Sequence, residues 1–142
     1  MADSPVYLLD TNILSDMMRN PEGAAAQQFR QVLALDNGGV VCTSVIVQCE
    51  LLFGLRRRSH PRWMTHYLRL MDAVIVKPLE AQTAAHYAQL RTQLEQLGTP
   101  IGANDTLIAA HALALDATLV TADTEFTRVP GLRVENWSLN SL

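Results

Sequence analysis

Leu8-Leu-Asp-Thr-Asn12 marks the point near the amino terminus where a short apolar run gives way to polar residues. The apolar run over residues 6–9 is typical of a buried strand. Asp10 and the two polar residues after it suit a turn or a helix cap, and apolar residues at helical spacing continue to Arg19. The sequence therefore predicts a strand that leads through Asp10 directly into a helix.

Strand and helix signals alternate along the rest of the chain. We expect helices over residues 24–35, 61–71 and 79–97. Two more helices are expected to begin at caps, one at Ser44 and one at Asn104 or Asp105. Further strands are expected over 40–43, 73–76, 118–121 and 132–137. This alternation predicts an α/β fold with a mainly parallel sheet and right-handed crossovers, and residues 1–142 as a single domain. In such sheets, sites form at the carboxyl ends of strands where the strand order reverses.

Composition excludes several classes of protein. The 142 residues are 49% hydrophobic and 18% charged, which is far from the composition of a disordered chain. No apolar run has the roughly 20 residues of a membrane span, and the first one is too short for a signal peptide, so we expect a cytoplasmic protein. A formal charge of -3 argues against broad nonspecific adhesion to nucleic acid. The cysteines and histidines lack the paired spacing of a zinc site.

Four acidic residues have settings that suggest a shared site. Asp10 ends the first predicted strand and Asp123 follows the fourth, so the two converge if these strands are neighbours, while Glu50 and Asp105 can join them from adjoining helices. Glu50 and Asp105 have apolar sequence neighbours, and burying their charges is costly without compensation. Mg²⁺ and Mn²⁺ prefer oxygen ligands and often act on phosphate groups. The pattern indicates metal-dependent phosphodiester chemistry.

Each candidate also has a purely structural interpretation. Asp10 and Asp105 could be helix caps, Glu50 could pair with an arginine, and Asp123 could belong to an ordinary turn. Three further residues could contact metal-bound water or substrate phosphate, or serve only as caps and turn residues: Thr11, Asn12 and Ser44.

A basic segment follows the helix that carries Glu50. It comprises Arg56, Arg57, Arg58, His60 and Arg62. These side chains could meet RNA phosphates, but a solvated helix end is the simpler interpretation.

The motifs together resemble one known family. They are Leu8-Leu-Asp-Thr-Asn12, Glu50-Leu-Leu-Phe-Gly54, Gly98-Thr-Pro-Ile-Gly102 leading to Asp105-Thr-Leu-Ile-Ala-Ala110, and Leu119-Val-Thr-Ala-Asp123 followed by Arg128-Val-Pro-Gly-Leu-Arg-Val-Glu-Asn-Trp137. The chain is similar to PIN-domain ribonuclease toxins of the VapC type, and the likeness spans nearly its whole length in the expected order.

The resemblance implies a three-layer α/β/α, PIN-like fold with a five-stranded sheet and Mg²⁺- or Mn²⁺-dependent cleavage of RNA. It also implies a homodimer and inhibition by a VapB-type antitoxin whose tail occupies the active site. The closest-looking subgroup resembles toxins that cut initiator transfer RNA. The family's acidic positions match four catalytic residues, of which we expect the three aspartates to bind metal: Asp10, Glu50, Asp105 and Asp123.

One segment departs from the family pattern. Related toxins often have two asparagines and a longer turn after the threonine, where this chain has Ala122-Asp-Thr-Glu125. Asp123 is the preferred fourth acidic residue because it is nearer the strand end, and Glu125 is the alternative.

Two other classes of protein compete with this interpretation. A dehalogenase-type phosphatase has a second aspartate two residues after the first, where this chain has Asn12. Such an enzyme also needs a lysine that steadies the transferred phosphate, and the only lysine in this sequence is Lys77. A noncatalytic receiver-like or scaffold module is the other alternative, and the full set of four acids weighs against it.

Overall fold

A five-stranded parallel sheet forms the centre of the computed structural model, which describes residues 4–35, 37–58 and 60–139. The strand order is β3-β2-β1-β4-β5, and all four strand pairs are parallel. The strands are β1 (Val6–Leu9), β2 (Val40–Ser44), β3 (Ile75–Lys77), β4 (Thr118–Val120) and β5 (Val134–Glu135). Residues 1–3 and 140–142 of the expected single domain lie outside the described residues.

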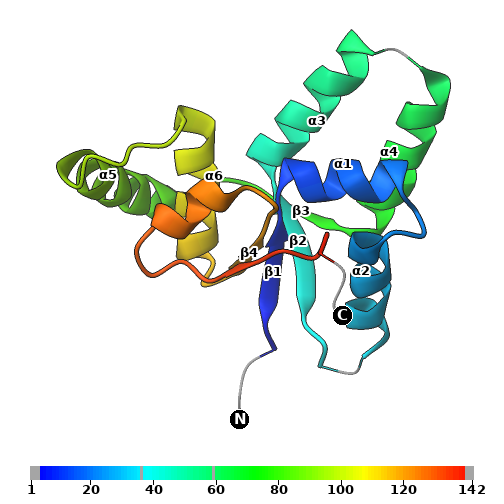
Figure 1. Ribbon diagram of the computed structural model, residues 1–142, viewed down its shortest axis with the longest axis horizontal. Helices are drawn as coiled ribbons and strands as arrows, with labels where there is room; N and C mark the ends of the chain where they lie inside the picture. The colour runs from blue at the N-terminus through cyan, green and yellow to red at the C-terminus, as the bar shows by residue number, and fades with distance from the viewer. Residues whose placement is uncertain (1–3, 36, 59, 140–142) are drawn as a thin grey trace.

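Helices cover both faces of the sheet and produce the three layers (Figure 1). Helices α5 and α6 lie together on one side, and α1, α2 and α4 lie on the other, with α3 and α4 projecting together beyond the strand ends. Their bounds are α1 (Thr11–Arg19), α2 (Ala24–Ala34), α3 (Val45–Arg57), α4 (Pro61–Ala73), α5 (Ala81–Gln96) and α6 (Ala103–Ala114), with a 3₁₀ helix η1 (Thr124–Arg128).

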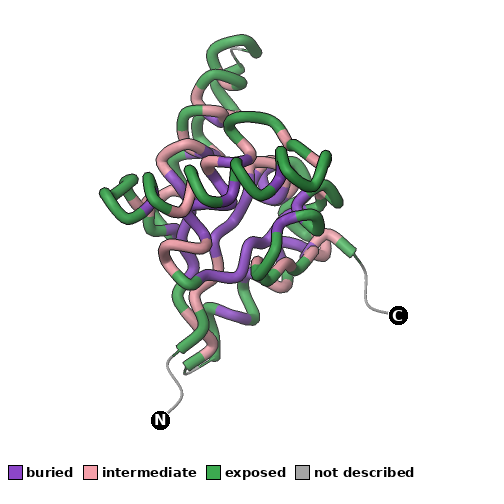
Figure 2. Tube along the Cα trace, turned by 90° about the vertical axis from the view of Figure 1, so that its left-hand side faces the viewer, coloured by how far each residue is buried: buried purple, intermediate pink, exposed green. Residues whose placement is uncertain are grey.

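The sheet order creates a switch point between β1 and β4. From β1 the chain proceeds outward to β2 and β3, and it then crosses back to place β4 on the other side of β1. Leu8 pairs with Cys42 of β2 and with Leu119 of β4, and all three side chains are buried. Figure 2 shows these buried strands at the centre of the molecule, inside a largely exposed periphery. The carboxyl ends of β1 and β4 are therefore the expected place for a site.

Several helix ends lie where the sequence predicts them. Asp10 and Ser44 cap α1 and α3 through their side chains, as the sequence predicts. The predicted stop at Gly98 is also present: Gly98 has a φ of 72°, and Thr99 N–H donates to the Leu94 carbonyl at 2.9 Å. The left-handed Gly98 and the 6→1 hydrogen bond from Thr99 form a Schellman motif, which favours glycine at the left-handed position.

Several boundary predictions were wrong, among them the start of α5 at Ala81 rather than residue 79. Strand β3 begins at Ile75 rather than residue 73, because its register is set by pairing with Cys42–Ser44 of β2. Helix α6 begins at Ala103 with Gly102 as its cap, so neither Asn104 nor Asp105 is the cap residue. Strand β5 covers only two of the six expected residues.

Among the described residues, none of the helices is both long and apolar enough to cross a membrane.

Candidate active site

Asp10 lies at the switch point, where β1 passes into α1. Its side chain is only 4% exposed, and three donors surround it. Oδ1 accepts a hydrogen bond from the backbone N–H of Thr11 at 2.8 Å, and Oδ2 accepts from Asn12 Nδ2 at 3.1 Å and from Thr121 Oγ1 at 2.7 Å. These bonds fix the orientation of the carboxylate and offset part of the cost of burying it.

Thr121 connects the end of β4 to the end of β1. Besides donating to Asp10, its hydroxyl oxygen accepts from Asn12 Nδ2 at 3.2 Å and from the Asp123 N–H at 3.0 Å. Asn12 Oδ1 in turn accepts from the Ala122 N–H at 2.9 Å. The two acidic strand ends predicted to converge are therefore joined by a continuous set of hydrogen bonds.

Glu50 enters the site from the second turn of α3. Thr11 Oγ1 donates a hydrogen bond to Glu50 Oε1 at 2.8 Å, which ties the carboxylate to the start of α1. The suggested alternative was an ion pair with an arginine. Among the residues that the structure describes, the ion pairs involve other carboxylates and leave Glu50 out. The ion-pair interpretation of Glu50 is therefore wrong.

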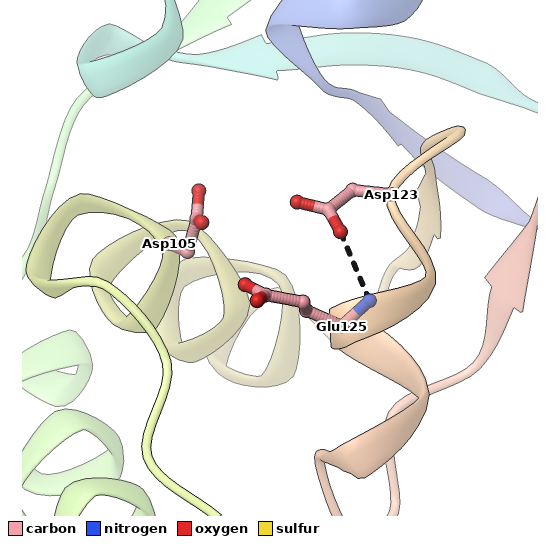
Figure 3. Close-up of side chains that lie close together, drawn as sticks. All are labelled: Asp105, Asp123 and Glu125. Atoms are coloured by element: carbon pink, nitrogen blue, oxygen red, sulfur yellow. Dashed lines mark hydrogen bonds between the residues drawn. The ribbon is translucent and has the colours of Figure 1, made fainter.

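Three further carboxylates face one another beside this network. Asp105 projects from the first turn of α6, while Asp123 and Glu125 come from the start of η1 (Figure 3). One carboxylate oxygen from each lies within 4.8 Å of the others. Asp123 Oδ1 also accepts the Glu125 N–H at 2.9 Å, so Asp123 has a fixed position as the η1 cap. Three carboxylates at this spacing form a donor set that fits a hard divalent cation.

The charges of the site act on one another. Burial, followed by the negative charges of Asp10, Asp123, Glu50 and Glu125, raises the pKa of Asp105 to about 6. Burial also raises the pKa of Asp10, although the hydrogen bonds from Thr121 and Thr11 oppose this effect. The five carboxylates thus belong to one electrostatic site, in which full ionisation is unfavourable without a compensating cation.

The predicted substrate contacts have different surroundings. Thr11 and Asn12 line the site, but their polar groups bind Glu50, Asp10 and backbone. Ser44 is 0% exposed, its oxygen accepts the Ile46 N–H at 3.1 Å, and it lies 2.8 Å from His111 Nδ1. These contacts favour capping over a substrate contact for Ser44, and positioning of the acids for Thr11 and Asn12.

Thr121 is a member of the site that was not among the residues predicted from the sequence. Its sequence signals are its place at the end of a predicted strand, two residues before Asp123, and its presence in the motif Leu119-Val-Thr-Ala-Asp123. Glu125 was recognised only as an alternative to Asp123, whereas the structure brings both of them to Asp105.

The chain is similar to known proteins in both sequence and fold. Residues 7–132 match the family model of the PIN domain. The chain is 35% identical to ribonuclease VapC2 of Rickettsia felis and 33% identical to the tRNA(fMet)-specific endonuclease VapC of Shigella flexneri. Each alignment covers 93% of this chain and 98% of the relative. Among solved structures, the chain is similar to one from a crystal of VapBC2 of Rickettsia felis bound to a promoter DNA fragment. That match has a TM-score of 0.85 and 31% identity over 93% of this chain and 98% of the other.

Proposed function

The chain belongs to the PIN-domain family and, within it, to the VapC ribonucleases, and from this premise we propose that its carboxylate cluster hydrolyses RNA with a bound divalent cation. The protein is an endoribonuclease and the toxin of a toxin–antitoxin pair, with a VapB-type antitoxin as its partner. The main support for metal-dependent hydrolysis at this site is the cluster of Asp105, Asp123 and Glu125, whose carboxylate oxygens lie within 4.8 Å of one another. Asp10 and Glu50 lie beside this cluster.

We assign the roles within the site from the contacts of each side chain. Asp10, Asp105 and Asp123 would hold Mg²⁺ or Mn²⁺, because they supply hard oxygen ligands from three rigid elements. When bound, the cation supplies an activated water and neutralises charge that develops on the phosphate. Thr121 and Asn12 hold Asp10 in place, and Thr11 orients Glu50, which would bind the attacking water and take up its proton.

The phosphatase alternative lacks support from the same contacts. The Asn12 amide donates to Asp10 and accepts from Ala122, so it serves as a structural link. Lys77 ends β3, which is an edge strand separated from β1 by β2. A transferred phosphate at Asp10 would therefore have no lysine from the adjacent strands.

Three other properties extend this proposal. Because one relative is named as specific for initiator transfer RNA, we place transfer RNA first among the candidate substrates. An enzyme with that substrate would act in the cytoplasm. Homodimer formation, which the resemblance implies, stays a prediction.

The direct test is metal-dependent cleavage by the purified protein. With Mg²⁺ or Mn²⁺ we expect RNA fragments with 5′-phosphate and 3′-hydroxyl ends, because activated water attacks phosphorus and the 3′ oxygen leaves. Excess EDTA should slow cleavage at least about a hundredfold, and added Mn²⁺ should restore it. End-specific ligation and mass spectrometry identify the termini. Cyclic phosphate ends that form equally well in EDTA would refute the mechanism, since they indicate attack by the ribose 2′-hydroxyl.

The relative importance of Asp123 and Glu125 is a separate prediction. Asp123 is half-buried and held as the η1 cap, whereas Glu125 is exposed on a longer side chain. We expect Asp123→Asn to raise the Mg²⁺ concentration for half-maximal cleavage by about a hundredfold, and Glu125→Gln by about tenfold or less. Metal titrations of the cleavage rate measure both values. The reverse order would make Glu125 the fourth ligand and leave Asp123 as a cap.

A further inference from the structure

A groove with a volume of about 350 Å³ adjoins the acidic site between α1, α3 and α4. Thr11 and Glu50 line the part that belongs to the site, and Arg19, Arg57 and Arg58 line another part. Because Arg57 follows Glu50 by seven residues on α3, it lies about 10 Å farther along the helix axis. The groove thus joins the carboxylates of the site to a group of cations.

Helical periodicity selects which arginines of the basic segment face this groove. Positions 50, 54 and 57 share one side of α3, Arg58 follows as its C-cap residue, and all four line the groove. Arg56 points to another side, where it lines a separate pocket with His60 and Met64. The basic segment is therefore divided between two surfaces, and only part of it adjoins Glu50.

The groove arginines have no acidic partner within the described part of the chain. The ion pairs found there involve Arg30, Arg91 and Arg133 instead. The guanidinium of Arg57 lies 5.5 Å from the centroid of the Phe53 ring, a cation–π contact that positions the group and retains its charge. Cations in this state can bind an external anion without first breaking an internal ion pair.

Gly54 keeps the middle of the groove free of a side chain. It lies inside α3, where glycine destabilises a helix by about 1 kcal/mol relative to alanine. A Cβ at this position would meet nothing within 4 Å, so packing within the chain does not require glycine here. Because Gly54 lines the groove, its missing side chain leaves space for a molecule that lies there.

We propose that this groove binds the RNA strand that adjoins the scissile phosphate, with Arg57, Arg58 and Arg19 contacting its phosphates. This inference rests on the proposed ribonuclease function. An acidic site repels a polyanion, so phosphates next to the one being cleaved need cations at a short distance. The groove also contains apolar side chains, including Leu51, Leu55 and Trp63, which suit unstacked bases of a single strand.

The charge of the groove favours RNA over the antitoxin as its occupant. A basic antitoxin tail, which the acidic site would attract, is repelled by three arginines, whereas phosphates are attracted by them. The antitoxin tail and the RNA would then approach the carboxylates along different surfaces, and only RNA binding would depend on these arginines.

The test compares adjacent arginines of α3. In an Asp105→Asn background that leaves RNA intact, fluorescence anisotropy measures binding of a fluorescein-labelled single-stranded oligoribonucleotide as salt increases. Arg57→Gln should weaken binding about fivefold and lower the slope of log affinity against log salt by about 0.7, the value for one phosphate contact. Arg56→Gln should change neither quantity, and Arg57→Lys should retain the slope. Equal slopes for all of these forms would overturn the proposal.

A second variant tests whether RNA binding needs the empty space of the groove, as distinct from its positive charge. Gly54→Leu should raise the thermal unfolding temperature, because leucine is a better helix former. It should also raise KM for RNA at least fivefold, because its side chain enters the groove. An unchanged KM in this stabilised variant would contradict RNA binding there. Loss of rescue by the antitoxin with unchanged RNA binding would assign the groove to the antitoxin.

These outcomes are separable from failure of the proposed function. Cleavage by the unmodified protein tests the nuclease activity, whereas the salt slope is measured with the inactive variant and needs no cleavage. A normal nuclease with identical slopes for Arg56→Gln and Arg57→Gln would refute only the groove.

Discussion

Asp105→Asn is expected to slow RNA cleavage by about a thousandfold and, at the same time, to stabilise the metal-free protein. Loss of a metal ligand removes on the order of 4 kcal/mol of transition-state stabilisation, which corresponds to about three powers of ten in rate. Single-turnover cleavage in saturating Mg²⁺ measures the loss. Asp72→Asn, an exposed aspartate on α4, is the matched control. Near-native cleavage by Asp105→Asn would remove Asp105 from the active site.

The stability gain follows from the raised pKa of Asp105. The folded protein holds this pKa at about 6, above its ordinary value of 3.8, so the unfolded chain ionises the group more readily. The free energy of unfolding of the metal-free wild type should therefore fall as pH rises from about 4 to about 6. Because Asp105 is partly exposed, we expect Asp105→Asn to recover only about 1 kcal/mol at pH 7.5. Thermal unfolding in EDTA at pH 4.5 and 7.5 measures the difference.

The corresponding change at Asp10 should behave differently. Asp10→Asn retains an acceptor for the Thr11 N–H but places an amide donor against the Asn12 amide. An unmatched buried polar group costs about 1–3 kcal/mol, so this variant should lose both activity and stability. Comparison of Asp105→Asn with Asp10→Asn therefore separates the loss of a proposed metal ligand from the loss of the hydrogen bonds that link the strand ends.

Expression of the protein without its antitoxin should arrest growth, and co-expression of the small protein encoded beside it should restore growth. The antitoxin tail can satisfy the acidic site because an arginine fork pairs well with carboxylates. A segment that becomes ordered on binding can also cover the site while the rest of the partner binds elsewhere. Colony counts with and without inducer measure arrest and rescue.

The inactive Asp105→Asn form is the control for this experiment. It should accumulate to at least the wild-type level and leave growth unaffected, because arrest depends on cleavage. Equal arrest by both forms would show that toxicity does not arise from catalysis. Failure of the neighbouring protein to rescue the wild type would reject its role as the antitoxin.

Local signals predicted the elements that carry the site. The apolar run before Asp10 and the cap at Ser44 predicted β1, α1 and α3, since these features depend on near neighbours in the chain. The same reasoning placed Asp10 and Asp123 at the ends of two strands that converge only if the strands are neighbours, and the pairing of β1 with β4 meets this condition. The catalytic roles of these residues stay predictions.

Features that depend on contacts between distant residues could not be predicted in this way. Thr121 acquires its place in the site from a hydrogen bond to Asp10, 111 residues away. The division of the basic segment required the orientation of α3, because neighbouring arginines look alike in sequence. The short β5 is defined by pairing with β4, and its own residues do not mark its ends.

The position of β1 at the centre of the sheet has a consequence for synthesis of the protein on the ribosome. Asp10 is made before its hydrogen-bond partner Thr121, which lies 111 residues later in the chain, and before Asp123, the predicted metal ligand. At about 5–20 residues per second, this order leaves the nascent chain without the complete candidate site for about 5–20 seconds after Asp10 is joined. A ribosome that translates this protein therefore carries a chain without the complete candidate site until Asp123 has been joined.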